Sequence, residues 1–278
     1  YNYALDQNGI VRWYVTQDFP SFNFVRIANG HFLATSEAKA TYLNMYEFDM
    51  MGQLHRFYVL DNQFHHSIWQ WDANTVIAPS EYTSGRPDAL KSNEDGVSVV
   101  DLTTGLEIAY YDMALILDPS RTPRPTGTAP GEDPTVSDWL HINQSYVNTT
   151  NNLLISSGRH QSAVFGVSLE NESLQFIMST HEDWAEQYQP YLLTPVNNDG
   201  MPLYDFSRPA DIQAANRDFW TWGQHNVVEI ANDDPGIVEF MVFDNGNFRS
   251  RNDENSLLPP DNYSRVVHFV IDLNAMTV

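Results

Sequence analysis

The chain has 278 residues, a formal net charge of −22 and no cysteine. This length suffices for one large domain or two small ones with a sizeable core. The negative charge argues against nucleic acid or an anionic membrane as a partner, because both bind basic surfaces. The lack of cysteine excludes disulfides, thiol nucleophiles and cysteine metal ligands. The sequence contains no run of about eighteen apolar residues, the length that a membrane-spanning helix needs. Residues 1–6 lack the features of a secretory signal peptide.

Short predicted strands, joined by turns rich in Asp, Asn and Gly, fill most of the chain. Residues 3–5 and 10–15 form the first hairpin, around a turn at 6–9. After it two kinds of hairpin alternate, and each pair of hairpins makes a unit that recurs along the chain. The predicted strands of these units span 22–27, 31–35, 43–48 and 54–60; 66–71, 75–78, 97–100 and 106–111; 141–147, 153–155, 163–169 and 174–178; and 225–230, 237–243 and 266–271.

Four-stranded units that repeat with the same order of turns are typical of the blades of a β-propeller. We therefore predict an all-β chain in which residues 1–278 form one propeller domain, incomplete at both ends, with about four and a half blades. A β-sandwich is the main alternative, but it does not predict the repeated order of turn types.

Three long loops interrupt the predicted blades, at 117–136, 181–219 and 246–264. The first is rich in proline, and one short helix is expected in the second, near 209–216. Loops of this length in a compact domain are more often functional than incidental.

Histidines recur at the first position of the predicted blades, where the innermost strands of a propeller face its central channel. His65 and His66 open the second unit, His141 opens the third, and His225 opens the fourth. Taken singly, each of these is more often a structural histidine. Together they predict one shared site at the channel.

Two chemistries fit such a cluster. One is a metal site, because neutral imidazole is a common metal ligand. Against it, no carboxylate shares the repeat pattern, and Arg159 would place a positive charge beside the cation. The other is anion chemistry, in which histidine acts as nucleophile or acid while Arg159 and Asn143 donate to the transferred oxygens. The predicted hairpin of 141–147 and 153–155 brings His141 near Arg159, which favours an anion.

Several motifs together resemble the bacterial arylsulfate sulfotransferase family, and they keep that family's order from about Tyr3 to Val278. They are Phe64-His65-His66, Asp138-Trp139-Leu140-His141-Ile142-Asn143, Ser157-Gly158-Arg159-His160-Gln161-Ser162-Ala163-Val164, Trp222-Gly223-Gln224-His225 and Phe243-Asp244-Asn245-Gly246-Asn247.

The resemblance implies a six-bladed propeller that moves a sulfuryl group from an aryl sulfate ester to a phenolic acceptor by a ping-pong mechanism. It implies no nucleotide sulfate donor, metal or other cofactor. The family's nucleophile maps onto His225, which would become a transient sulfohistidine. The position of residues 243–249 opposite the start of the His225 strand is expected to place Asn245 or Arg249 near the channel mouth, with Asn245 as a substrate-binding residue. The family's supporting residues map onto His141, one of His65 and His66, Asn143 and Arg159.

Two departures from the family stand out. The last blade expected of the family lies beyond this sequence. Gram-negative members resemble one another in a disulfide near the active site, which a chain without cysteine cannot form. We expect aromatic residues to hold the 181–219 loop instead, namely Trp184, Tyr188, Tyr191, Phe219, Trp220 and Trp222.

By the same resemblance, the partners are a small-molecule aryl sulfate donor and a phenolic acceptor, in a periplasmic or extracellular location. Whether the protein forms a homodimer is open. Two other functions remain open as well: a non-catalytic propeller that binds an anionic or sulfated ligand or a protein partner, and a histidine-ligated metal enzyme.

Overall fold

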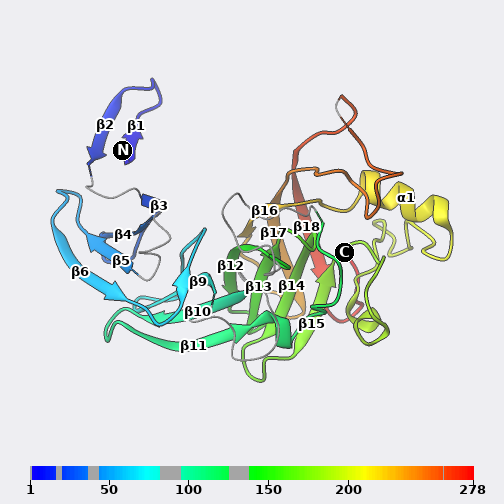
Figure 1. The fold of residues 1–278 in the computed structure, drawn as a ribbon, viewed down its shortest axis with the longest axis horizontal. Coiled ribbons are helices and arrows are strands. Elements are labelled where there is room, and N and C mark those ends of the chain that lie inside the picture. Colours follow the sequence, from blue (N-terminus) through cyan, green and yellow to red (C-terminus); the bar gives the residue numbers. More distant parts are fainter. Residues whose placement is uncertain (1, 17–20, 37–43, 82–94, 125–137, 259) are drawn as a thin grey trace.

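The computed structural model describes residues 2–16, 21–36, 44–81, 95–124, 138–258 and 260–278. Within these residues the chain forms five antiparallel sheets that succeed one another in chain order (Figure 1). The prediction of an all-β chain is therefore confirmed. The helices among the described residues are too short or too polar to cross a membrane.

The strands match the predicted hairpins with few exceptions. The first sheet pairs β1 (Asn2–Leu5) with β2 (Val11–Val15), and the second has the order β3 (Ser21–Arg26), β4 (Phe32–Ser36), β5 (Asn44–Phe48) and β6 (Leu54–Val59). The third contains β7 (Gln63–Phe64), β8 (Trp69–Gln70), β9 (Thr75–Glu81), β10 (Gly96–Asp101) and β11 (Leu106–Asp112). The fourth has the order β12 (Ile142–Asn148), β13 (Leu153–Gly158), β14 (Ala163–Ser168) and β15 (Leu174–Met178), and the fifth has β16 (His225–Glu229), β17 (Ile237–Asp244) and β18 (Arg265–Asp272).

The outer turns form because an aspartate or asparagine near their start bonds the backbone that follows. In the β5–β6 turn, Asp49 Oδ1 accepts from the backbone N–H groups of Met51 (2.8 Å) and Gln53 (3.0 Å). Gly52 closes this turn with a φ of 78°, a conformation that glycine adopts without steric cost. This local chemistry explains why the hairpins could be read from the sequence.

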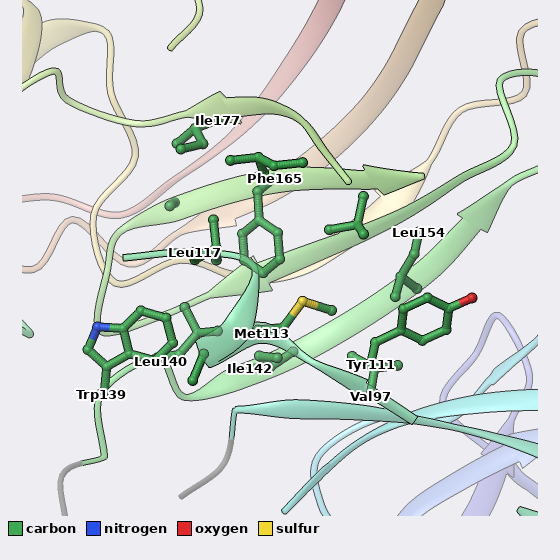
Figure 2. Close-up of a cluster of buried hydrophobic side chains, with 14 of the residues drawn as sticks. Val97, Tyr111, Met113, Leu117, Trp139, Leu140, Ile142, Leu154, Phe165 and Ile177 are labelled. Carbon is green, nitrogen blue, oxygen red and sulfur yellow. The ribbon is translucent and has the colours of Figure 1, made fainter. Parts of the chain in front are cut away.

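Neighbouring sheets pack face to face through buried apolar side chains. Figure 2 shows the cluster between the third and fourth sheets, where Val97 and Tyr111 approach Leu154 and Phe165. Trp139, Leu140 and Ile142 lie in the same cluster, and so the core fixes the chain on both sides of residue 141. Stacked antiparallel sheets of three to five strands are compatible with a propeller, which stays a prediction.

Two strand predictions were wrong at their starts. The expected strand 66–71 is broken into β7 and β8, because His66 between them has a φ of 56°. Likewise β12 begins at Ile142, since His141 has a φ of 53°. A left-handed residue cannot continue the pleated strand, and alternation of residue types does not show where one will occur.

The loop 181–219 contains the short helix η3 (Glu186–Tyr191) and the predicted helix, observed as α1 (Pro209–Asp218). Proline suits the first position of α1, where its missing N–H has no helical partner. Trp184 in this loop, and Trp220 and Trp222 directly after it, are buried against the fourth and fifth sheets, as expected of the aromatic residues that hold the loop.

The other two predicted loops are described only in part. Residues 113–115 form the short helix η2 (Met113–Leu115), and 117–124 are irregular, while 125–136 lie outside the described residues. Residues 246–264, apart from 259, contain no helix or strand.

Candidate active site

Three histidines from three different sheets meet at one place. The ring centroid of His66 lies 4.8 Å from that of His141 and 6.5 Å from that of His225. His65 is buried behind His66, with its Nδ1 2.8 Å from the His66 Nδ1. Of the two neighbouring histidines, His66 is therefore the one that faces the cluster.

Unusual backbone conformations place these rings. His66 and His141 have left-handed φ angles of 56° and 53°, and Asn226, directly after His225, has a φ of 52°. Each such residue costs about 1–3 kcal/mol and persists only where its surroundings enforce it. Here buried neighbours enforce it, including Leu140 beside His141.

His225 is oriented by the neighbouring strand of its own sheet. Its Nδ1 lies 2.9 Å from Oδ1 of Asn245, which follows β17 directly. Because an amide oxygen only accepts, Nδ1 carries the hydrogen and the lone pair of the neutral ring is on Nε2. Burial lowers the pKa of His225, and the charges of Arg159 and His141 lower it further, while the bond to Asn245 opposes them. His225 is thus held neutral and nucleophilic near pH 7.

The backbone on either side of Asn245 is held by the buried carboxylate of Asp244, which accepts from the N–H group of Gly246. Neither the Asp244 side chain nor the Arg249 side chain is exposed, and the two form an ion pair of 2.9 Å. A buried charge that is paired and fully hydrogen-bonded is rigid. Asp244 accepts from the backbone N–H groups of Trp222 (2.8 Å) and Gly246 (2.9 Å), from Arg249 Nη2 (2.9 Å) and from Arg265 Nε (2.9 Å).

Gln224 ties the start of β16 to the fourth sheet. Its fully buried side chain donates to the carbonyl oxygens of Gly158 (3.3 Å) and Ala163 (2.9 Å). Asn143 Nδ2 in turn donates to the Gln224 carbonyl oxygen at 2.7 Å. The structure therefore gives Asn143 a contact that positions the backbone directly before His225, and its role in binding substrate stays a prediction.

Arg159 lies beside the histidines, as the hairpin predicted. Its backbone N–H donates to the carbonyl oxygen of His141 at 3.1 Å. Its guanidinium Nη1 lies 2.6 Å from Nε2 of His160. A half-buried guanidinium next to three imidazoles can neutralise an oxyanion bound among them.

Two polar residues of this cluster, Asp138 and His160, were not assigned a role from the sequence. Asp138 Oδ2 lies 2.7 Å from His141 Nδ1 and 3.3 Å from His160 Nδ1. The rings of His141 and His160 stack at 4.6 Å. A carboxylate therefore joins the histidines, although none shares their repeat position. The signal was present in the Asp138–Asn143 motif, but Asp138 precedes the strand and so lies outside the repeat pattern.

Asp138, His141 and His160 also offer ligand atoms within 4.8 Å of one another, a spacing that a metal ion can use. Carboxylate and imidazole are suitable donors for a divalent transition metal. The guanidinium of Arg159 against His160 disfavours a cation there. Burial and the charges of His141 and Arg159 lower the pKa of His160, although Asp138 opposes them.

Comparison with known proteins agrees with these motifs. A family model described as Arylsulfotransferase (ASST) matches residues 1–278. A protein named Arylsulfate sulfotransferase AssT from Lelliottia amnigena is 25% identical over 320 residues, which cover 100% of this chain and 51% of that protein. One of the same name from Escherichia coli O6:H1 is 26% identical over 322 residues, with the same coverage of 100% and 51%. The chain spans about half the length of these curated relatives.

Proposed function

Because this chain belongs to the arylsulfotransferase family, we propose that the whole protein transfers a sulfuryl group from an aryl sulfate ester to a phenolic acceptor. The observation that carries the proposal is the meeting of His66, His141 and His225 from three sheets beside the guanidinium of Arg159. Such a site supplies both a nucleophile and fixed positive donors for a group with three anionic oxygens.

In this proposal His225 attacks sulfur through Nε2 while the phenoxide leaves, and the resulting sulfohistidine passes the group to a second phenol. The bond from Nδ1 to Asn245 keeps the lone pair on Nε2, and the lowered pKa keeps the ring neutral. Arg159 and His66 stabilise the oxygens as charge spreads over them in the transition state. The reaction is ping-pong and needs no nucleotide sulfate donor.

A phenol-release assay tests the proposal on the full-length protein. Release from 4-nitrophenyl sulfate that accelerates when an acceptor phenol is added, with sulfated acceptor as product, indicates transfer. Binding of the ester without release would instead support a non-catalytic propeller for an anionic ligand. Release at a rate independent of the acceptor, with free sulfate as product, would indicate hydrolysis.

Acid- or base-quenched samples identify the nucleophile, since a sulfated histidine can be located by peptide mass spectrometry. His225→Ala should abolish both the sulfated peptide and turnover. A matched control is His268→Ala, which removes a half-exposed histidine on β18 that pairs with Glu239 (2.8 Å) far from the cluster. Unchanged sulfation in His225→Ala would refute the assignment.

Arg159→Ala tests the oxyanion role. We expect turnover to fall on the order of 10²-fold or more with the fold intact. Near wild-type turnover would show that Arg159 serves only the structure.

A metal-dependent enzyme is the second candidate, and the spacing of Asp138, His141 and His160 favours it. This alternative predicts stoichiometric metal by elemental analysis and loss of turnover with a chelator. From the family resemblance we also propose a periplasmic or extracellular location. Subunit number by light scattering decides between monomer and homodimer.

A further inference from the structure

The protonation of His160 is fixed by its two neighbours. Arg159 Nη1 lies 2.6 Å from His160 Nε2, and a guanidinium only donates hydrogen bonds. Nε2 must therefore accept, and the ring hydrogen is on Nδ1. That nitrogen lies 2.6 Å from the carbonyl oxygen of Asp138 and 3.3 Å from its Oδ2, both of which accept. His160 is almost fully buried, and as the neutral Nδ1–H tautomer it has partners at both nitrogens.

The protonation of His141 follows from the same carboxylate. Asp138 Oδ2 lies 2.7 Å from His141 Nδ1, and an ionised carboxylate only accepts. The His141 hydrogen therefore lies on Nδ1, and the lone pair of its neutral ring is on Nε2. The stacked ring of His160, 4.6 Å away, covers one face of His141. The ring is held at its edge by a carboxylate and at its face by an imidazole.

These contacts join the Arg159 guanidinium and the Asp138 carboxylate into one hydrogen-bonded chain. It runs from the Arg159 guanidinium through His160 to Asp138, and from Asp138 to His141. Asp138 and His160 are mostly or fully buried, with 12% and 4% of their side chains exposed. They cannot easily exchange these partners for water.

We propose that Asp138 and His160 are positioning residues, Asp138 fixing His141 as the acid and base of the reaction and His160 fixing the direction of Arg159. This inference rests on the proposed sulfuryl transfer. His141 first binds a proton from solvent at Nε2. As the ester oxygen leaves sulfur it takes this proton, while His225 Nε2 bonds to sulfur. In the second half, the acceptor phenol gives its proton back to His141 Nε2 as its oxygen attacks sulfur and the nitrogen–sulfur bond breaks. Asp138 stabilises the imidazolium form in both halves.

The activity test uses Asp138→Asn and two donors, 4-nitrophenyl sulfate and phenyl sulfate. An asparagine can present its NH₂ group to His141 Nδ1 and so reverse the tautomer of the ring. The more basic phenoxide needs a proton as it leaves, whereas 4-nitrophenoxide needs little help. We expect kcat/KM for phenyl sulfate to fall on the order of 10²- to 10⁴-fold. The fall for 4-nitrophenyl sulfate should be at least about tenfold smaller.

Asp49→Asn is the matched control. Asp49 Oδ2 contacts His55 Nε2 at 2.9 Å on the outer turn between β5 and β6, and so the variant loses a similar Asp–His contact outside the site. It should keep wild-type kinetics with both donors. Equal losses for both donors in Asp138→Asn would mean a purely structural role and would overturn the proposal.

A spectroscopic test separates this inference from the proposed function. In the full-length protein with ¹⁵N-labelled histidine, long-range ¹H–¹⁵N spectra near pH 7.5 should show the Nδ1–H tautomer for both His141 and His160. Asp138→Asn should convert His141 alone. This result holds whether or not phenol is released, so an inactive wild type would sink only the transfer reaction. An Nε2–H tautomer at either residue, or a metal bound in place of these protons, would overturn the positioning role.

Discussion

Replacing Asn245 by aspartate should move the pH dependence of the reaction, because it places a carboxylate against the proposed nucleophile. The Asn245 oxygen lies 2.9 Å from Nδ1 of His225, and an aspartate of the same shape brings a negative charge to that distance. In the native protein burial is the largest cause of the lowered His225 pKa, and the hydrogen bond to the uncharged Asn245 amide opposes it without reversing it. A carboxylate would oppose it far more strongly, since opposite charges within hydrogen-bonding distance favour the protonated ring.

The size of the shift follows from that contact. An adjacent opposite charge changes a pKa by about 1–3 units, and below the new pKa each unit costs about tenfold in neutral imidazole. The native protein should lose kcat/KM only below about pH 6.5, the ordinary histidine value, because the pKa of His225 is lowered. In Asn245→Asp the loss should begin about 1–3 pH units higher than in the native protein.

The assay is the initial rate of phenol release from 4-nitrophenyl sulfate by the full-length protein, at low ester concentration and between pH 5 and about 9. The pH of half-maximal kcat/KM is the readout, because a general loss of activity does not move it. Asn171→Asp is the control, since Asn171 is exposed in the outer turn after β14 and its oxygen only caps Ser173. An acidic limb at the same pH in Asn245→Asp and the native protein would refute the assigned contact or the assigned nucleophile.

Three further predictions concern stability. Asp244→Asn should lower the free energy of unfolding by about 3–5 kcal/mol in denaturant titrations, because it leaves a buried guanidinium unpaired; a loss under about 1 kcal/mol would contradict this. Gly158→Ala should cost about 1–3 kcal/mol, because its Cβ would lie 2.4 Å from Leu140 Cδ1, and an unchanged unfolding midpoint would show that the core adapts. Burial lowers the pKa values of His160 and His181, so below about pH 6.5 the unfolded chain binds more protons than the folded chain. The free energy of unfolding should therefore fall there as pH falls, and His181→Gln should reduce this slope.

Most of the hairpins could be predicted because their signals are local. The aspartate and glycine at a turn bond within a few residues, as Asp49 and Gly52 do, and therefore leave a readable pattern. The left-handed conformation of His66 has no such signal, because histidine is compatible with a strand and only the packing around it enforces the break. The strand starts at His66 and His141 were wrong for this reason.

The candidate site, too, was predictable where the signal is local in the sequence and not where it depends on contacts between distant segments. The repeat placed His66, His141 and His225 at equivalent positions, and the structure brings them together. Contacts between different segments were not predictable, such as the side chain of Gln224 reaching Ala163 on another sheet. Asp138 was missed although it is only three residues before His141, since it lies in the segment that leads into β12 and not at a strand position of the repeat.

The left-handed residues at the three imidazoles show how the site keeps its geometry. Each of three sheets supplies one imidazole, and every one of the three lies beside a left-handed residue or is one itself. Such positions are strained, so they stay in place only through rigid support on both sides. That support is apolar around His141, where Leu140 and Ile142 are fully buried, and polar around His225, where Asn245 is held through Asp244.

Donors fixed in this way need no rearrangement when charge develops on transferred oxygens, which is the condition for strong electrostatic stabilisation. The supporting residues should therefore affect turnover more than substrate affinity, whereas a residue that binds the ground state and the transition state equally would change KM alone.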